Sequence, residues 1–214
     1  MFMASSDNPG LINKVAPKFY LALGDSYTIG EAVKATERFP ELLVYYLHQQ
    51  KINFAPPEII AATGWTTADL LQAIAESPPV HAAYALVTLL IGVNNQYQQR
   101  PLEEYETELV QLVKLAVGYA GGHKKNVVVL SIPDYGVTPF AADKNPELIA
   151  ASIAVFNQIN KKIANQFEVQ YVDITLASRL AATDPSLIAS DGLHPSGLAY
   201  LLWASMLLAI MNDE

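Results

Sequence analysis

The apolar run AYALVTLLI at residues 83–91 is nearly continuous and has the length of a strand. A strand that is apolar on successive residues has to be covered on both of its faces. Such burial is typical of parallel sheets that carry helices on both sides. The run stops at Gly92, which is followed closely by Asn94 and Asn95. It therefore predicts a central strand of an α/β protein that ends in a polar loop.

Further strand-length runs alternate along the chain with segments of helical periodicity. The predicted strands cover residues 18–23, 58–62, 83–91, 126–132 and 169–174. The predicted helices cover residues 37–50, 66–77, 102–119, 146–167 and 196–211. This alternation predicts a parallel sheet with right-handed crossovers and helices on both faces. The chain of 214 residues shows no linker, so we expect one domain over residues 1–214, with 1–17 as a lead-in.

Composition excludes several classes of function. A net charge of −8 makes nucleic acid an unfavourable partner. The absence of Cys excludes disulfides, thiolate catalysis and Cys-ligated metal. The apolar runs are too short or too interrupted to cross a bilayer, so no integral membrane association is expected. We expect a soluble protein, cytoplasmic as the chain stands or exported if a leader has been removed. Its oligomeric state stays open.

Polar residues and glycines follow the predicted strands where each strand ends. Ser26 follows the first strand in FYLALGDSYTIG, Gly64 follows the second, and Asn94 follows the third. The carboxyl ends of parallel strands lie at one edge of a sheet, so these positions are expected to meet there. The loop before the last helix carries Asp191 and His194 and reaches the same edge.

These residue types fit the parts of an acyl-transfer site. A serine hydroxyl is a weak nucleophile and needs a base, which His194 can supply to Ser26. Asp191 precedes His194 by three residues, so on a tight turn its carboxylate can orient the imidazole. The backbone N–H groups of Ser26 and Gly64 and the side-chain amide of Asn94 are candidate oxyanion donors.

The same segments, GDS at 24–26, Gly64, GVN at 92–94 and DGLH at 191–194, resemble the four blocks of the SGNH (GDSL-type) serine hydrolases. The resemblance covers essentially the whole chain. It implies a flavodoxin-like three-layer α/β/α fold with sheet order 2-1-3-4-5. It also implies an esterase or lipase-like enzyme acting on a small-molecule ester, with no metal or cofactor.

The resemblance assigns each site residue a role. Ser26 is the nucleophile, Asp191 and His194 complete the triad, and Gly64 and Asn94 join the Ser26 amide in the oxyanion hole. Two positions depart from the family pattern. Tyr27 stands where Leu is common, and Asn95 stands where Asp is usual.

Three further carboxylates have to be weighed against these roles. Asp25 precedes the serine and is interpreted as a loop-organising residue. Asp134 follows the fourth strand at the same edge, where it could line the pocket or make a turn, and the turn is favoured. Asp173, near the end of the fifth strand, competes with Asp191 for the triad, and the closeness of Asp191 to His194 favours Asp191.

Four aromatic residues also follow strand ends, namely Tyr27, Trp65, Tyr97 and Tyr135. They are candidates for substrate binding, and the alternative is that they cover the end of the sheet.

Two rival functions use the same fold. A non-catalytic flavodoxin-like binding module is disfavoured because no Gly-rich phosphate loop follows the first strand. A phosphoesterase is disfavoured because no second carboxylate accompanies Asp25 to hold magnesium. The loops are compact and contain no inserted lid, which favours a small or accessible acyl group.

Overall fold

The computed structural model describes residues 16–212, which fold around a five-stranded sheet. The strands are β1 (Tyr20–Gly24), β2 (Glu58–Ala61), β3 (Leu86–Leu90), β4 (Val127–Leu130) and β5 (Gln170–Val172). Every pairing is parallel and the order is β2-β1-β3-β4-β5. The predicted fold class and strand order are confirmed.

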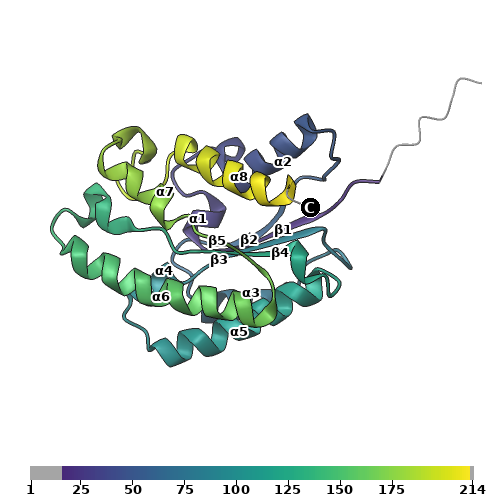
Figure 1. The fold of residues 1–214 in the computed structure, drawn as a ribbon, viewed down its shortest axis with the longest axis horizontal. Coiled ribbons are helices and arrows are strands. Elements are labelled where there is room, and N and C mark those ends of the chain that lie inside the picture. Colours follow the sequence, from purple (N-terminus) through teal and green to yellow (C-terminus); the bar gives the residue numbers. More distant parts are fainter. Residues whose placement is uncertain (1–15, 213–214) are drawn as a thin grey trace, which may run out of the picture.

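Helices cover both faces of this sheet, giving three layers (Figure 1). One layer contains α2 (Phe39–Gln49) and α8 (Gly197–Asn212), with the short α1 (Ser26–Ile29) and α7 (Thr175–Arg179). The other contains α3 (Thr67–Glu76), α5 (Leu102–Tyr119) and α6 (Pro146–Phe167), with the short α4 (Val93–Tyr97). Short 3₁₀ segments complete the connections at 35–37, 124–126, 135–137, 139–141, 180–182 and 185–187.

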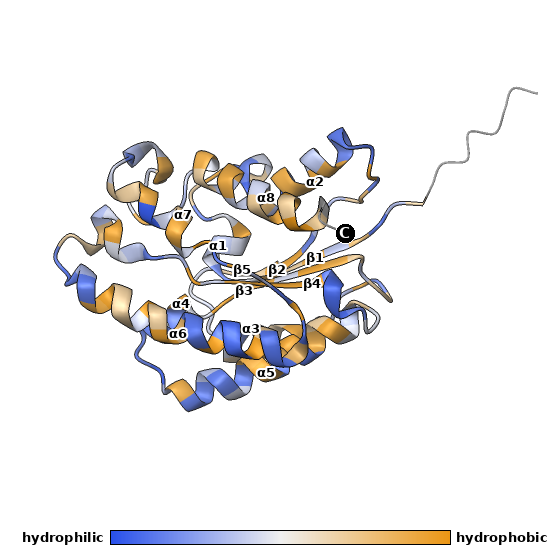
Figure 2. Cartoon of the chain, in the orientation of Figure 1, coloured by the Kyte–Doolittle hydropathy of each residue, from blue (hydrophilic) through white to orange (hydrophobic). Residues whose placement is uncertain are grey.

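The pattern of burial explains which runs became central strands. Every residue of β1, β3 and β4 is buried, as expected for strands covered on both faces. β2 lies at the edge of the sheet, and all its residues are only half-buried. Figure 2 shows hydrophobic strands between the two helical layers.

The structure corrects the predicted limits of several elements. β3 begins at Leu86, because its register starts opposite Tyr20 and the preceding Tyr84 N–H bonds to the carbonyl of Tyr119. The loop expected after the first strand contains α1, and the one after the third contains α4. The predicted lead-in lies outside the described residues up to position 15, and Lys18 pairs with Phe54 beyond it.

α3 begins at Thr67, one residue after the predicted start of this helix at residue 66. Thr66 caps this helix by accepting a hydrogen bond from the Asp69 N–H, and Asp69 in turn accepts one from the Thr66 N–H, a reciprocal capping box. Within residues 16–212, no helix is both long enough and apolar enough to cross a membrane.

Candidate active site

Ser26 is placed by a sharp junction between β1 and α1. Gly24 ends the strand, and a Cβ there would lie 2.1 Å from Thr28 Oγ1 and 2.4 Å from the Leu90 carbonyl oxygen. Only glycine therefore fits where the chain turns. Asp25 then caps α1 by accepting the Tyr27 N–H at 3.0 Å. Ser26 becomes the first residue of α1, at the carboxyl end of the sheet.

His194 and Asp191 form a compact pair on the loop before α8. Nδ1 of His194 lies 2.6 Å from Oδ2 of Asp191. Oδ1 of Asp191 accepts the N–H groups of Leu193 and His194, each at 3.0 Å. The three hydrogen bonds fix the carboxylate on the turn, so it holds the imidazole in one orientation.

The protonation of this pair follows from its hydrogen bonds. Burial acts to raise the pKa of Asp191, but the hydrogen bonds from the His194 ring and from two backbone N–H groups outweigh it and lower the pKa. The carboxylate is then an acceptor only, so Nδ1 has to carry the hydrogen of the short bond. Nε2 of a neutral His194 is thereby left as an acceptor.

Ser26 and His194 line the same pocket, which has a volume of about 140 Å³. Its other lining residues come from several strand ends: Tyr27, Thr63, Gly64, Val93, Asn94, Tyr97, Tyr135, Phe140 and Leu193. Within residues 16–212, no hydrogen bond joins the Ser26 hydroxyl to the ring of His194. Catalytic hydrogen bonds are commonly long until substrate binds. The structure thus brings one predicted residue from each of four separate segments to this pocket, namely Ser26, Gly64, Asn94 and His194, and Asp191 lies behind His194.

The two predicted oxyanion donors line this pocket together. Gly64 adopts φ +85°, a conformation that favours glycine, and a Cβ there would meet no atom within 4 Å. Its backbone is therefore open to a ligand. Asn94 donates one Nδ2 hydrogen to the carbonyl of Trp65 at 2.9 Å. A side-chain amide has two such hydrogens, so the second remains for the pocket.

Asn95, which stands where the family usually has Asp, is fully buried and ties three helices together. Its Oδ1 accepts the Thr67 N–H at 3.0 Å, and its Nδ2 donates to Thr67 Oγ1 at 2.7 Å. Thr67 Oγ1 then donates to the carboxylate of Glu108. The chain of bonds links α4, α3 and α5, so the loop after β3 is held by an amide instead of a charge.

Tyr27, the second departure from the family pattern, supports the histidine. Its ring meets the His194 ring edge-on, with centroids 5.5 Å apart, and lies 6.1 Å from Trp203. Tyr97 and Tyr135 also line the pocket, as predicted for substrate-binding candidates. Trp65 does not line it, and its side chain packs against the hydrophobic core.

The other carboxylates have separate partners. Asp25 is buried and burial raises its pKa to about 7, although the Tyr27 N–H opposes the shift. Asp134 accepts the Gly136 N–H and pairs with Arg179 at 2.9 Å, which fits its interpretation as a turn residue. It also lines a small cavity next to His194, but not the Ser26 pocket. Asp173 accepts hydrogen bonds from Ser131 and Thr175.

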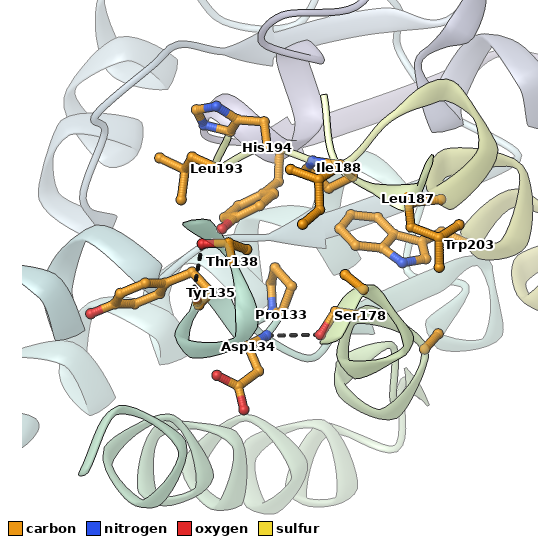
Figure 3. A pocket seen from close by; sticks show the side chains of 15 residues that line it. Pro133, Asp134, Tyr135, Thr138, Ser178, Leu187, Ile188, Leu193, His194 and Trp203 are labelled. Atoms are coloured by element: carbon orange, nitrogen blue, oxygen red, sulfur yellow. Dashed lines mark hydrogen bonds between the residues drawn. The ribbon is translucent and has the colours of Figure 1, made fainter. Parts of the chain in front are cut away.

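A smaller cavity, drawn in Figure 3, shares His194 with the Ser26 pocket. Its labelled walls include Pro133, Leu187, Ile188 and Trp203. Tyr135 and Leu193 line both this cavity and the Ser26 pocket. The volume of the smaller cavity is about 20 Å³. That is room for about one water molecule, so this cavity is too small for a substrate group.

Comparison with known proteins decides the family. The model of the GDSL-like lipase/acylhydrolase family matches residues 22–202, which include every predicted site residue. The chain belongs to the GDSL-like lipase/acylhydrolase family. It is accordingly a carboxylic ester hydrolase. No curated protein sequence matches it.

Solved structures of low sequence identity share the fold of this GDSL-like hydrolase. One is Axe2, an acetylxylan esterase from Geobacillus stearothermophilus, with 20% identity, a TM-score of 0.67 and coverage of 92% and 95% of the two chains. Another is a lipolytic G-D-S-L family protein from Veillonella parvula, with 17% identity, a TM-score of 0.69 and coverage of 91% and 98%. A third is the esterase EstA from Pseudoalteromonas, with 16% identity, a TM-score of 0.66 and coverage of 92% and 97%.

Sequence reasoning missed several residues of the pocket in this GDSL-like hydrolase. Leu193 lies inside the segment that supplies Asp191 and His194, and Val93 lies inside the one that supplies Asn94. Their positions next to predicted site residues could have identified them as pocket residues. Phe140 had a weaker signal, since it follows β4 only after a 3₁₀ turn. Among residues 16–212, no group of acidic, His or Cys side chains is placed to hold a metal ion.

Proposed function

We propose that the enzyme cleaves esters through a Ser26–His194–Asp191 triad and a covalent acyl-enzyme. The observation that carries the proposal is the 2.6 Å hydrogen bond between His194 Nδ1 and Asp191 Oδ2, at the pocket that Ser26 also lines. This bond leaves Nε2 as the acceptor for the serine proton. Geometry of this kind is the recognisable feature of a triad.

The first half-reaction transfers the acyl group to the serine. Ser26 Oγ attacks the ester carbonyl carbon while its proton passes to His194 Nε2. The carbonyl oxygen gains the negative charge of the tetrahedral intermediate. When the intermediate collapses, the bond to the alcohol oxygen breaks, and that oxygen takes the proton from Nε2. Asp191 stabilises the imidazolium during these steps.

The second half-reaction returns the enzyme to its starting state. Water gives a proton to Nε2 and attacks the acyl-enzyme carbonyl, and Ser26 leaves with that proton. In both halves the oxyanion accepts hydrogen bonds from the Ser26 and Gly64 backbone N–H groups and from the second Nδ2 hydrogen of Asn94. Donors fixed in advance in this way stabilise the charge that develops in the transition state.

The pocket supports a small or accessible acyl group as the substrate. Its volume of about 140 Å³ is close to that of an apolar cavity, about 150 Å³, that holds benzene. The phenyl-sized space suits a short acyl chain next to Ser26.

The test is hydrolysis of p-nitrophenyl butyrate by the purified protein and by Ser26→Ala. Loss of the nucleophile is expected to lower kcat by about 10⁶-fold. The matched control is Ser205→Ala, because that exposed hydroxyl bonds to the Leu201 carbonyl of its own helix and lies outside the pocket. Equal activity of Ser26→Ala and the wild type would contradict the proposed mechanism.

Two further measurements separate the rival functions. A chelator is expected to leave activity unchanged, whereas restoration of activity by magnesium or manganese would point to a phosphoesterase. A fluorophosphonate is expected to label Ser26. Failure to label a folded protein would favour a non-catalytic binding module. The EstA esterase of Pseudoalteromonas is inhibited by monoethylphosphonate, which makes this class of probe suitable.

A further inference from the structure

A second and larger groove opens beside the Ser26 pocket. Its volume is about 580 Å³, compared with about 140 Å³ for the pocket itself. Tyr97 and Tyr135 line both spaces, and their rings meet edge-on with centroids 6.1 Å apart. The two spaces therefore meet at this pair of rings.

The groove presents aliphatic side chains to solvent along one face of α6. Leu148 and Val155 form its outer wall, and Ile149 and Phe156 form its buried floor. Leu148 is 69% exposed, and its significance lies in its position next to other exposed apolar side chains of the same groove. Leu102, at the start of α5, also lines the groove. α4 and α6 lie side by side at the end of the sheet that carries Ser26 (Figure 1). Contiguous exposed apolar surface of this kind marks ligand-binding grooves.

The charged groups at the rim of the groove are already paired. Arg100 bonds to the carboxylate of Glu104 through two nitrogens. Lys144 bonds to Asp143 at 3.1 Å and to the Phe140 carbonyl at 3.2 Å, and its ammonium lies 4.4 Å from the centre of the Phe140 ring. Both cations that line the groove in the described part of the chain are thus paired with a carboxylate, which competes with a phosphate for them. Gln96, Gln99 and Ser152 also line the groove among the aliphatic side chains, so a sugar is the rival occupant that the experiment has to exclude.

The position of the groove relative to the triad indicates whether the groove faces the acyl part or the alcohol part of the ester. In the proposed reaction, the leaving oxygen has to face Nε2 of His194. The groove leaves the pocket past Tyr97, on the same short helix as the oxyanion donor Asn94. Because His194 lines the Ser26 pocket but not the groove, the groove lies on the side of the pocket away from Nε2 and from the leaving alcohol.

We propose, resting on the proposed function, that this groove binds the alkyl chain of a medium- or long-chain acyl group whose carbonyl lies at Ser26. The pocket holds the first carbons, and the chain passes the rings of Tyr97 and Tyr135 into the open groove. The acyl group stays accessible, because the groove is open along its length.

The first experiment is a chain-length series of p-nitrophenyl esters from acetyl to dodecanoyl. Burial of each methylene in an open groove is expected to raise kcat/KM by about two- to fourfold beyond butyryl. Leu148→Asp places a charge in the groove and is expected to lower the ratio of decanoyl to butyryl activity by about tenfold. The matched control is Leu176→Asp on α7, which is 68% exposed and outside this groove, and it should keep the wild-type ratio.

A binding measurement tests the groove without relying on catalysis. Decanamide and butanamide are titrated into the Ser26→Ala protein by calorimetry. Decanamide has a longer alkyl chain than butanamide. If each additional methylene raises the affinity twofold, decanamide is expected to bind about 60-fold more tightly. Leu148→Asp in the same background should remove most of this difference.

The outcomes separate the groove from the triad. One outcome would overturn the groove proposal and leave the mechanism intact. In it, kcat/KM does not change with chain length, butyrate hydrolysis still depends on Ser26, and the two amides bind equally. Ser26-independent hydrolysis would overturn the mechanism, and the amide titration would still decide the groove. Preference for acetylated xylo-oligosaccharides over every longer acyl ester would assign the groove to a sugar and overturn the proposal.

Discussion

Replacing Asn95 with Asp, the residue usual in the family, is expected to destabilise this chain. Asn95 Nδ2 donates to Thr67 Oγ1, whose own hydrogen is given to Glu108. The carboxylate introduced by Asn95→Asp has no hydrogen to donate, so it and Glu108 have to compete for the single hydroxyl hydrogen of Thr67. One hydrogen bond is lost and a charge enters a site where the side chain is fully buried.

The magnitude follows from these two losses. A missing hydrogen bond costs about 1 kcal/mol, and a buried carboxylate with incomplete partners adds about 1–3 kcal/mol. The free energy of unfolding should therefore fall by about 2–4 kcal/mol above neutral pH. Burial and the nearby Glu108 both raise the pKa of the new carboxyl, so the penalty should shrink as the pH is lowered and this carboxyl takes up a proton.

Urea unfolding of the wild type and of Asn95→Asp between pH 5 and pH 8 measures this effect. Adding Glu108→Gln should recover at least about 1 kcal/mol, because the glutamine amide can donate to Thr67 and free its hydrogen for the introduced carboxylate. Asn145→Asp is the matched control, since this residue caps α6 by accepting the Leu148 N–H and Asp caps equally well. Equal stability of Asn95→Asp and the wild type at pH 8 would refute the reasoning.

Three further substitutions test the site. Burial raises the pKa of Asp25 from 3.8 to about 7, so the folded state binds this proton more tightly than the unfolded state. The contribution of this group to the free energy of unfolding is fully present below about pH 4 and is lost as the pH rises to about 7. Denaturant titrations should therefore show that the wild type loses on the order of 4 kcal/mol relative to Asp25→Asn over this range. A constant difference across this range would contradict the assignment. Asn94→Ala should lower kcat for a butyryl ester by about 100- to 1000-fold by removing one oxyanion donor, and full activity would argue against that role. Asp191→Asn should lower kcat by about 10⁴-fold while the fold is kept, because the amide no longer fixes the Nδ1–H tautomer, and a rate near that of the wild type would remove Asp191 from the triad.

The sheet and the location of the site could be predicted from the sequence because both depend on where strands end. The buried run before Gly92 indicated a strand covered on both faces, and β3 is buried at every position. Once the strands are parallel, residues such as Ser26, Gly64 and Asn94 have to gather at one edge. These residues then lie close together although they are far apart in the sequence.

Side-chain direction could not be predicted in the same way. Trp65 and Tyr97 both follow strand ends, yet Tyr97 lines the pocket and Trp65 packs against the core. The backbone of Trp65 still serves the site, because its carbonyl accepts the Asn94 amide. The position of a residue after a strand determines at which edge of the sheet it lies. The direction of its side chain depends on the local turn.

Short helices and contacts between distant segments also escaped sequence reasoning. α1 and α4 have four and five residues, too few to show a helical period. The network of Asn95, Thr67 and Glu108 joins three separate helices across gaps of 28 and 41 positions in the chain. Only the packed structure brings these side chains within hydrogen-bonding distance.

The identity of the nucleophile is tested most directly by mass spectrometry of the protein after reaction with a fluorophosphonate. The proposed triad predicts one phosphonyl group per chain, carried by the peptide that contains Ser26, and no label on Ser26→Ala. His194→Ala should react far more slowly, because the serine then lacks its base. Label on another residue, or equal labelling of Ser26→Ala, would contradict the assignment of Ser26 as the nucleophile.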